Sequence, residues 1–229
     1  MISIYKIQAL YVKQFKNLMY NYFVLAGFIV PLGMAFLMRM VTEPSETAGL
    51  FVMMTQMSIL LGGANTMCCL IAEEKEKDTL SVLMSSTVSS LDFLISNSLI
   101  TSTFTMMLNV AIYFMLAPEF MSFTTYLLVT TLATIISTIL GAIIGLVSKN
   151  QMTATTVASP ILLLLSFIPL VFMDSPFVQN FLYFSFTEQL GLVLLGQSVT
   201  FSGILLKLAN LLVLVIAFTW LYKRKGFSE

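Results

Sequence analysis

The sequence predicts an all-α membrane protein with six membrane-spanning helices. Of its 229 residues, 58% are hydrophobic and 10% are charged, and the mean hydropathy is +0.96. Soluble domains carry about 25% charged residues, so this chain has too few polar side chains to cover a water-exposed surface. Strict apolar-polar alternation is absent, which makes a membrane β-barrel a weak alternative. Five charge-free runs each exceed the about 20 residues that a helix needs to cross a bilayer: 17–38, 47–72, 93–118, 120–148 and 150–173.

The sixth span is predicted at 202–222, directly before the basic segment "YKRKG". Lys207 lies within this run, close enough to one end for its long side chain to reach the interface. The preceding segment 177–201 is also apolar, with Glu188 near its centre. A full span there would move the basic C-terminal segment to the outside. We therefore expect 177–201 to be a re-entrant outer segment, made of two short pieces that dip into the outer leaflet.

The distribution of basic residues predicts that both termini are cytoplasmic. With six spans and the N-terminus inside, the outer loops 41–48, 118–122 and 174–201 contain no Lys or Arg. The inner segments then hold nine basic residues: Lys6, Lys13, Lys16, Lys75, Lys77, Lys149, Lys223, Arg224 and Lys225. This is the asymmetry of the positive-inside rule.

Residues 1–19 predict an amphipathic helix in the inner headgroup region rather than a secretory signal. At 100° per residue, one narrow face is apolar and the opposite face is basic. The apolar face contains Ile4, Ile7, Tyr11, Phe15 and Leu18, and the polar face contains Lys6, Lys13, Lys16 and Asn17. An ordinary juxtamembrane helix with no further role is the alternative.

Several kinds of chemistry are excluded or disfavoured by composition. The chain has no histidine and no phosphate-binding G-x-x-x-x-G-K-[ST] motif. Cys68 and Cys69 are adjacent and are expected to be buried, unreactive thiols, and the 16 methionines are expected to be apolar filler. We expect a non-catalytic chain with no metal site, no cofactor of its own and no nucleic-acid partner.

Small polar residues recur at helical spacing within the spans. One interpretation is a substrate path for a lipophilic or amphipathic molecule, lined by Thr55, Ser58, Asn65, Thr155 and Ser159. The alternative is that these residues hold neighbouring helices together, as Gly141 and Gly145 of "GAIIG" would do by close packing. The sequence leaves both open.

A dense run of charge, "EEKEKD" at 73–78, follows the second span. The run is expected in water, at the start of a cytoplasmic loop 73–92. Thr79 can cap a short helix, "LSVLM", and Ser89 with Asp92 matches a capping box that opens the third span. The loop is suited to dock on a cytoplasmic partner; a solvated stop-transfer linker is the alternative.

The segment "IAEEKEKDTLSVLMSSTVSSLDFLISNSLI" resembles the intracellular loop of type-2 ATP-binding-cassette (ABC) permeases. That family pattern is Glu-(Lys/Arg)-Glu, then Gly-Thr, a following Leu, a Pro turn and a Lys early in the next span. Glu74, Lys75, Glu76, Thr79, Leu80 and Leu83 match it. Asp78 stands in place of Gly, Thr87 near the Pro position and Asn97 near the Lys position. The resemblance extends over 1–229 as a single transmembrane domain.

The resemblance implies a multi-pass permease in a bacterial plasma membrane, paired with a second permease chain and resting on a separate ATPase subunit that binds ATP and Mg. The loop would couple to the ATPase through Glu73, Glu74, Lys75, Glu76, Thr79, Leu80 and Leu83. Export of an antimicrobial or toxin-like peptide, or of a lipophilic drug, would be the activity. A non-transporting immunity or regulatory protein and an ATP-independent transporter or channel are the alternatives.

Overall fold

A computed structural model describes residues 4–43, 47–85, 88–116, 121–171, 185–196 and 201–225. These residues form helices joined by short turns, with no strand among them. The elements are α1 (Ile4–Tyr20), α2 (Tyr22–Val41), α3 (Thr47–Met57), η2 (Ser58–Asn65), α4 (Thr66–Glu76), α5 (Thr79–Ser85), α6 (Ser90–Leu116), α7 (Phe123–Val147), α8 (Gln151–Val171), α10 (Phe186–Leu194) and α11 (Phe201–Lys225).

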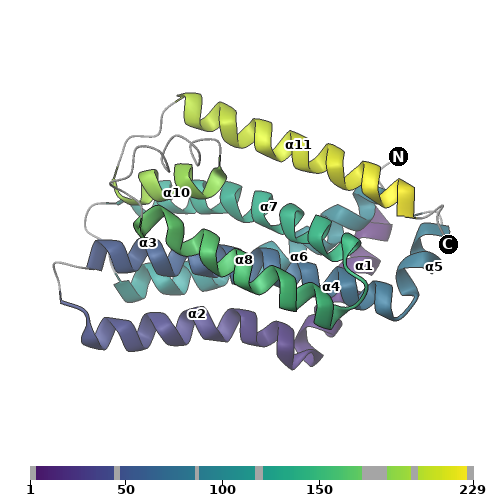
Figure 1. The fold of residues 1–229 in the computed structure, drawn as a ribbon, viewed down its shortest axis with the longest axis horizontal. Coiled ribbons are helices and arrows are strands. Elements are labelled where there is room, and N and C mark those ends of the chain that lie inside the picture. Colours follow the sequence, from purple (N-terminus) through teal and green to yellow (C-terminus); the bar gives the residue numbers. More distant parts are fainter. Residues whose placement is uncertain are drawn as a thin grey trace.

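The long helices lie side by side in one bundle (Figure 1). Among the described residues, five helices are long and apolar enough to cross a membrane: Val24–Val41, Thr47–Glu76, Ser90–Leu116, Phe123–Val147 and Phe201–Arg224. The apolar helix Gln151–Phe167 within α8 is shorter by the same measure. An all-helical protein with several helices long and apolar enough to span a membrane is therefore confirmed, whereas the remaining predicted span, at α8, does not reach that length.

The helix Thr47–Glu76 is the centre of the bundle, because it packs against α2, α6, α7 and α8 and is mostly buried. Its middle section, η2, is a π-helix of eight residues. Gly141 of α7 meets this section so closely that an added Cβ would lie 1.9 Å from the Ala64 carbonyl oxygen. Gly145 lies one turn further along, against the backbone of Cys68. The close-packing role expected of these glycines is confirmed.

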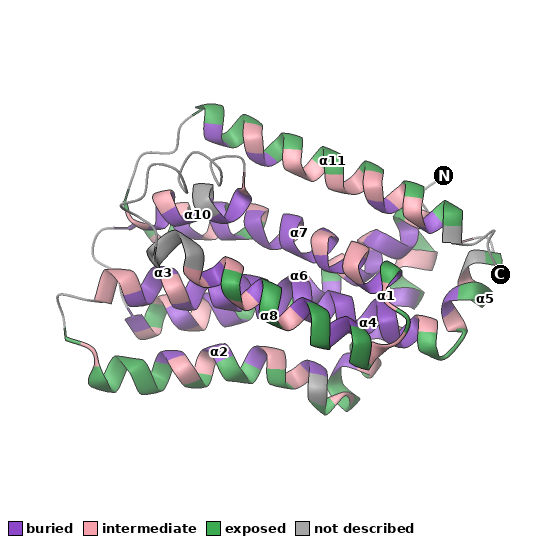
Figure 2. Cartoon of the chain, in the orientation of Figure 1, coloured by how far each residue is buried: buried purple, intermediate pink, exposed green. Residues whose placement is uncertain are grey.

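The outer helices α2 and α11 expose most of their apolar side chains, as the green segments of Figure 2 show. Trp220, Leu212 and Val213 of α11 and Ile29 and Leu37 of α2 are among them. In water such faces would be unfavourable, whereas lipid chains solvate them. The distribution of apolar residues is therefore that of a protein surrounded by lipid.

The capping box that opens α6 is confirmed. Ser89 donates its backbone N–H to Asp92 Oδ2 at 3.3 Å, and Asp92 donates its own N–H to Ser89 Oγ at 3.1 Å. These reciprocal bonds satisfy backbone donors that a helix start otherwise leaves free. Cys68 and Cys69 are buried free thiols, also as expected.

The predicted re-entrant segment 177–201 is described only in part, since 177–184 and 197–200 lie outside the described residues. Within it, Ser185 caps α10 by accepting the Thr187 N–H at 3.3 Å. α10 packs against α3, α7, α8 and α11 at the end of the bundle opposite α5 (Figure 1). Lys207, one of the two unusual charges of this region, is buried on α11.

The N-terminal segment is helical, as expected, but its apolar residues lie on two separate faces. One face is buried against protein and the other is exposed. Leu10, Gln14 and Leu18 are buried, and α1 packs against α6. Ile4 and Phe15, which were expected on the same apolar face as Leu18, are exposed. The difference arises because α1 contacts protein on one side and leaves a second apolar stripe free for lipid.

Candidate functional site

The candidate site is the charged junction, which we define as Glu73, Glu74, Lys75, Glu76 and Lys77 at the end of α4. It lies at the end of the bundle that α1, α5 and the last turns of α11 also occupy (Figure 1). The expectation that all these charges are in water is wrong for two of them, since Glu73 is 9% exposed and Glu74 is 1% exposed. Buried carboxylates require partners, and the junction supplies them from several helices.

Glu74 joins α4 to the N-terminal helix. Its carboxylate accepts hydrogen bonds from Lys13 Nζ and Gln14 Nε2, both at 2.7 Å, and from the Thr79 hydroxyl. Thr79 also donates to the Glu74 carbonyl at 3.0 Å, so its hydroxyl points back to α4. The expected capping of α5 by Thr79 is therefore replaced by a bond that closes the turn between α4 and α5.

Glu73 joins α4 to the start of the first spanning helix. Its carboxylate accepts from Asn21 Nδ2 at 2.8 Å and from Lys77 Nζ, four residues on. Asn21 in turn accepts the Val24 N–H, and so caps α2. The hydrogen bond and the charge of Glu73 raise the pKa of Lys77, so Lys77 stays protonated at neutral pH.

Lys75 and Glu76 hold the ends of two other spans. Lys75 Nζ donates to the carbonyls of Leu146 and Ser148, at 3.4 and 2.8 Å, where α7 ends. Glu76 accepts the backbone N–H of Gln151 at 3.0 Å, where α8 begins. A cation at a helix C-terminus and an anion at an N-terminus both match the helix dipole. Four consecutive charged residues thus connect α4 with α1, α2, α7 and α8.

α5 is the short helix that follows the junction. Leu80 is 5% exposed and belongs to an apolar cluster with Met67, Ile71, Phe93 and Tyr222. Leu83 is partly buried beside the same cluster, whereas Val82 is 65% exposed. Burial leaves Leu80 and Glu74 unsuited to the direct partner contacts expected of them. Among the side chains of α5 that the structure describes, the outward surface is formed by Val82, Ser81, Ser85 and part of Leu83.

Asp78 lies between the two helices with a φ of 55°, in the left-handed region. Its N–H bonds the Lys75 carbonyl at 3.1 Å and ends α4. Left-handed backbone at this position is ordinary for Gly and tolerated by Asp. Asp78 therefore occupies a backbone conformation that Gly would adopt without strain.

Replacing Asp78 should therefore change stability in a predictable order. We expect Asp78→Gly to be neutral or stabilising by up to about 1 kcal/mol, and Asp78→Val to be destabilising by about 1–2 kcal/mol. Thermal unfolding of the purified protein in detergent measures the order. A lower midpoint for Asp78→Gly than for Asp78→Val would contradict it.

The five residues expected to line a substrate path are mostly engaged inside the bundle. Thr55 bonds the Tyr126 hydroxyl at 3.3 Å, Ser58 donates to Asn109, and Ser159 donates to Asn65 Oδ1 at 3.1 Å. Thr155 donates to carbonyls of its own helix, at Gln151 and Met152. The bonds of Thr55, Ser58 and Ser159 join neighbouring helices, the role that the sequence left open, whereas those of Thr155 stay within α8.

Three partners of the charged junction were not predicted from the sequence: Lys13, Gln14 and Asn21. Gln14 carried a signal, because it interrupts the stripe formed by Leu10 and Leu18, and a polar residue within a buried stripe indicates a buried partner. No comparable signal linked Asn21 to Glu73, 52 residues away.

Among the described residues, no group of three or more acidic, Cys or His residues is arranged to bind a metal ion. No family model matches the sequence, and neither does any curated protein.

Proposed function

We propose that the chain is the membrane-spanning permease subunit of an ABC exporter in a bacterial plasma membrane. It would pair with a second permease chain, with both termini cytoplasmic and ATP hydrolysed on a separate ATPase subunit. The cargo would be a hydrophobic or amphipathic compound, such as an antimicrobial or toxin-like peptide or a lipophilic drug. The observation that carries the proposal is the charged junction, which connects α4, the helix that leads into α5, with four other helices at one end of the bundle.

The junction supports a mechanical role for α5. A partner that pushes on α5 moves α4 through the turn that Glu74 and Thr79 close. Lys75 and Glu76 pass the displacement to the end of α7 and the start of α8, and Lys13 passes it to α1. The π-helical η2 lies further along the same central span, and such segments are frequent at functional sites in helices. We propose that the span bends there.

Direct contact with the ATPase would come from the outward surface of α5, with Val82 at its centre and Leu83 beside it. Desolvated apolar contacts of this kind carry most of the binding energy in an interface, whereas exposed ion pairs contribute only about 0.2–1 kcal/mol each. Glu74 and Leu80 would act indirectly, by holding α5 in place.

The test is the double substitution Val82→Ser/Leu83→Ser, with Leu212→Ser, an exposed apolar position near the middle of α11, as the control. We expect the double variant to insert and fold, but to lose co-purification with the ATPase and to lower cargo-stimulated ATP hydrolysis in lipid vesicles at least about tenfold. The control should behave as the unaltered chain. Full stimulation in the double variant would reject the coupling role of α5. A chain that never binds an ATPase would favour an immunity or regulatory protein, or an ATP-independent transporter.

A further inference from the structure

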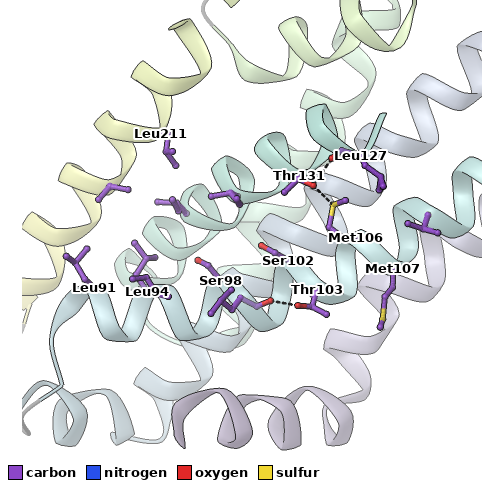
Figure 3. Close-up of a pocket in the computed structure, with 16 residues that line it drawn as sticks. Leu91, Leu94, Ser98, Ser102, Thr103, Met106, Met107, Leu127, Thr131 and Leu211 are labelled. Atoms are coloured by element: carbon purple, nitrogen blue, oxygen red, sulfur yellow. Dashed lines mark hydrogen bonds between the residues drawn. The ribbon is translucent and has the colours of Figure 1, made fainter. Parts of the chain in front are cut away.

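A large apolar groove runs along the membrane-spanning part of the bundle, between α6, α7 and α11 (Figure 3). Its volume is about 910 Å³, and no charged residue is among the residues that line it. α6 lines it from Leu91 to Val110, α7 from Leu127 to Ile139, and α11 contributes Leu211 and Val215. None of the five residues of the expected substrate path lines this groove.

The groove is as long as a membrane is thick. From Leu91 to Val110, α6 rises by about 28 Å at 1.5 Å per residue, and the hydrocarbon core of a bilayer is about 30 Å thick. Lipid chains reach only to the middle of the bilayer from either side. A single occupant that fills the groove from end to end is therefore a membrane-spanning one.

Two serine hydroxyls indicate what kind of occupant fits. Ser98 and Ser102, one turn apart on α6, are among the residues that line the groove (Figure 3). Their Oγ atoms are buried and lack a hydrogen-bond partner within the described part of the chain. Thr103 and Thr131 on the same groove are different, because each donates to a carbonyl of its own helix, at 2.8 and 2.6 Å.

Unpaired hydroxyls in hydrocarbon are unfavourable, and Ser102 lies near the midpoint of α6, where lipid chains carry no acceptor. A helix does carry acceptors at that depth, since each backbone carbonyl has a second lone pair beyond its own helical bond. Small residues one turn apart also allow two helix backbones to approach closely.

We propose that the groove binds an apolar membrane-spanning α-helix of a separate polypeptide, and that Ser98 and Ser102, by rotation about χ1, turn their buried hydroxyls to donate to its backbone. The helix enters sideways from the bilayer between α6 and α11. This inference does not rest on the proposed function, because it requires neither an ATPase nor transport.

The test uses disulfide cross-linking in lipid vesicles, in a Cys68→Ala/Cys69→Ala background. The probe is a synthetic helical peptide of about 23 Leu and Ala residues with lysines at both ends and one central cysteine. Thr103→Cys places a thiol on the exposed rim of the groove. Val213→Cys, 62% exposed near the middle of α11 and outside the groove lining, is the control at similar depth. We expect at least about tenfold more cross-linking at Thr103→Cys.

Two further variants test the groove itself. Ser98→Phe/Ser102→Phe should fill it and reduce cross-linking at Thr103→Cys to the control level. Ser98→Ala/Ser102→Ala removes only the donors and should reduce it by about three- to tenfold. Unfolding temperatures of both double variants near that of the background chain show that the fold is retained.

Two outcomes would overturn the proposal. Equal cross-linking at Thr103→Cys and Val213→Cys would mean that lipid occupies the groove. Efficient disulfide formation between two Thr103→Cys chains, with exclusion of the peptide, would assign the groove to a second copy of this chain.

Discussion

Gly141→Leu should prevent the bundle from assembling, and even Gly141→Ala should be strongly destabilising. A Cβ at this position would lie 1.9 Å from the Ala64 carbonyl oxygen and 2.8 Å from the Ala64 Cα, which are backbone atoms of the central helix. A flexible side chain could move aside, but a backbone buried among four helices cannot, so α7 and η2 must separate. Overpacking usually costs about 1–3 kcal/mol, and a backbone clash places Gly141→Ala at or above the top of that range.

Gly33→Ala is the matched control, because a Cβ added at Gly33 on α2 meets nothing within 4 Å. Cys68 and Cys69 provide the measurement, since both thiols are buried and become reactive toward a fluorogenic dye only on unfolding. We expect Gly33→Ala to unfold at or above the temperature of the unaltered chain, and Gly141→Ala well below it. Similar unfolding temperatures for the two variants would show that the tight contact between α7 and η2 is absent.

Glu74→Lys should have the second largest effect. The substitution places a cation at a site that is 1% exposed, beside Lys13, and removes the acceptor for Gln14 and Thr79. Breaking a buried ion pair typically costs about 3–5 kcal/mol. Because the Lys13 side chain is 38% exposed, we expect about 3 kcal/mol for the broken pair, with the repulsion between two cations in addition.

Two variants separate the charge effect from the loss of packing. Glu74→Gln keeps the size and an acceptor, and should cost about 1–2 kcal/mol. Lys13→Glu/Glu74→Lys restores opposite charges and should recover part of the stability lost in Glu74→Lys, as measured by the dye assay. A double variant no more stable than Glu74→Lys alone would mean that the Lys13–Glu74 pair does not hold α1 to α4.

The helices of this fold could be predicted from the sequence. Helix formation, and the side of a helix that can face lipid, depend on residues that are close together along the chain. Charge-free runs located the long helices within a few residues of their observed bounds, and Ser89 with Asp92 marked the start of α6. The spacing of Gly141 and Gly145 indicated one close-packed face of α7. Each of these signals lies within a few turns of one helix, where the 3.6-residue period determines which side chains share a face.

The sequence by itself determined that the chain is helical, that several helices can span a membrane, and that charge is concentrated after the second span. Only the tertiary structure decided what that charge does. The burial of Glu74 depends on Lys13, 61 residues away, and the role of Lys75 depends on the Ser148 carbonyl, 73 residues away. A charge in a linker and a charge in a junction have the same local sequence, because the free energy of burying a carboxylate depends on partners that the packing of distant helices brings to it.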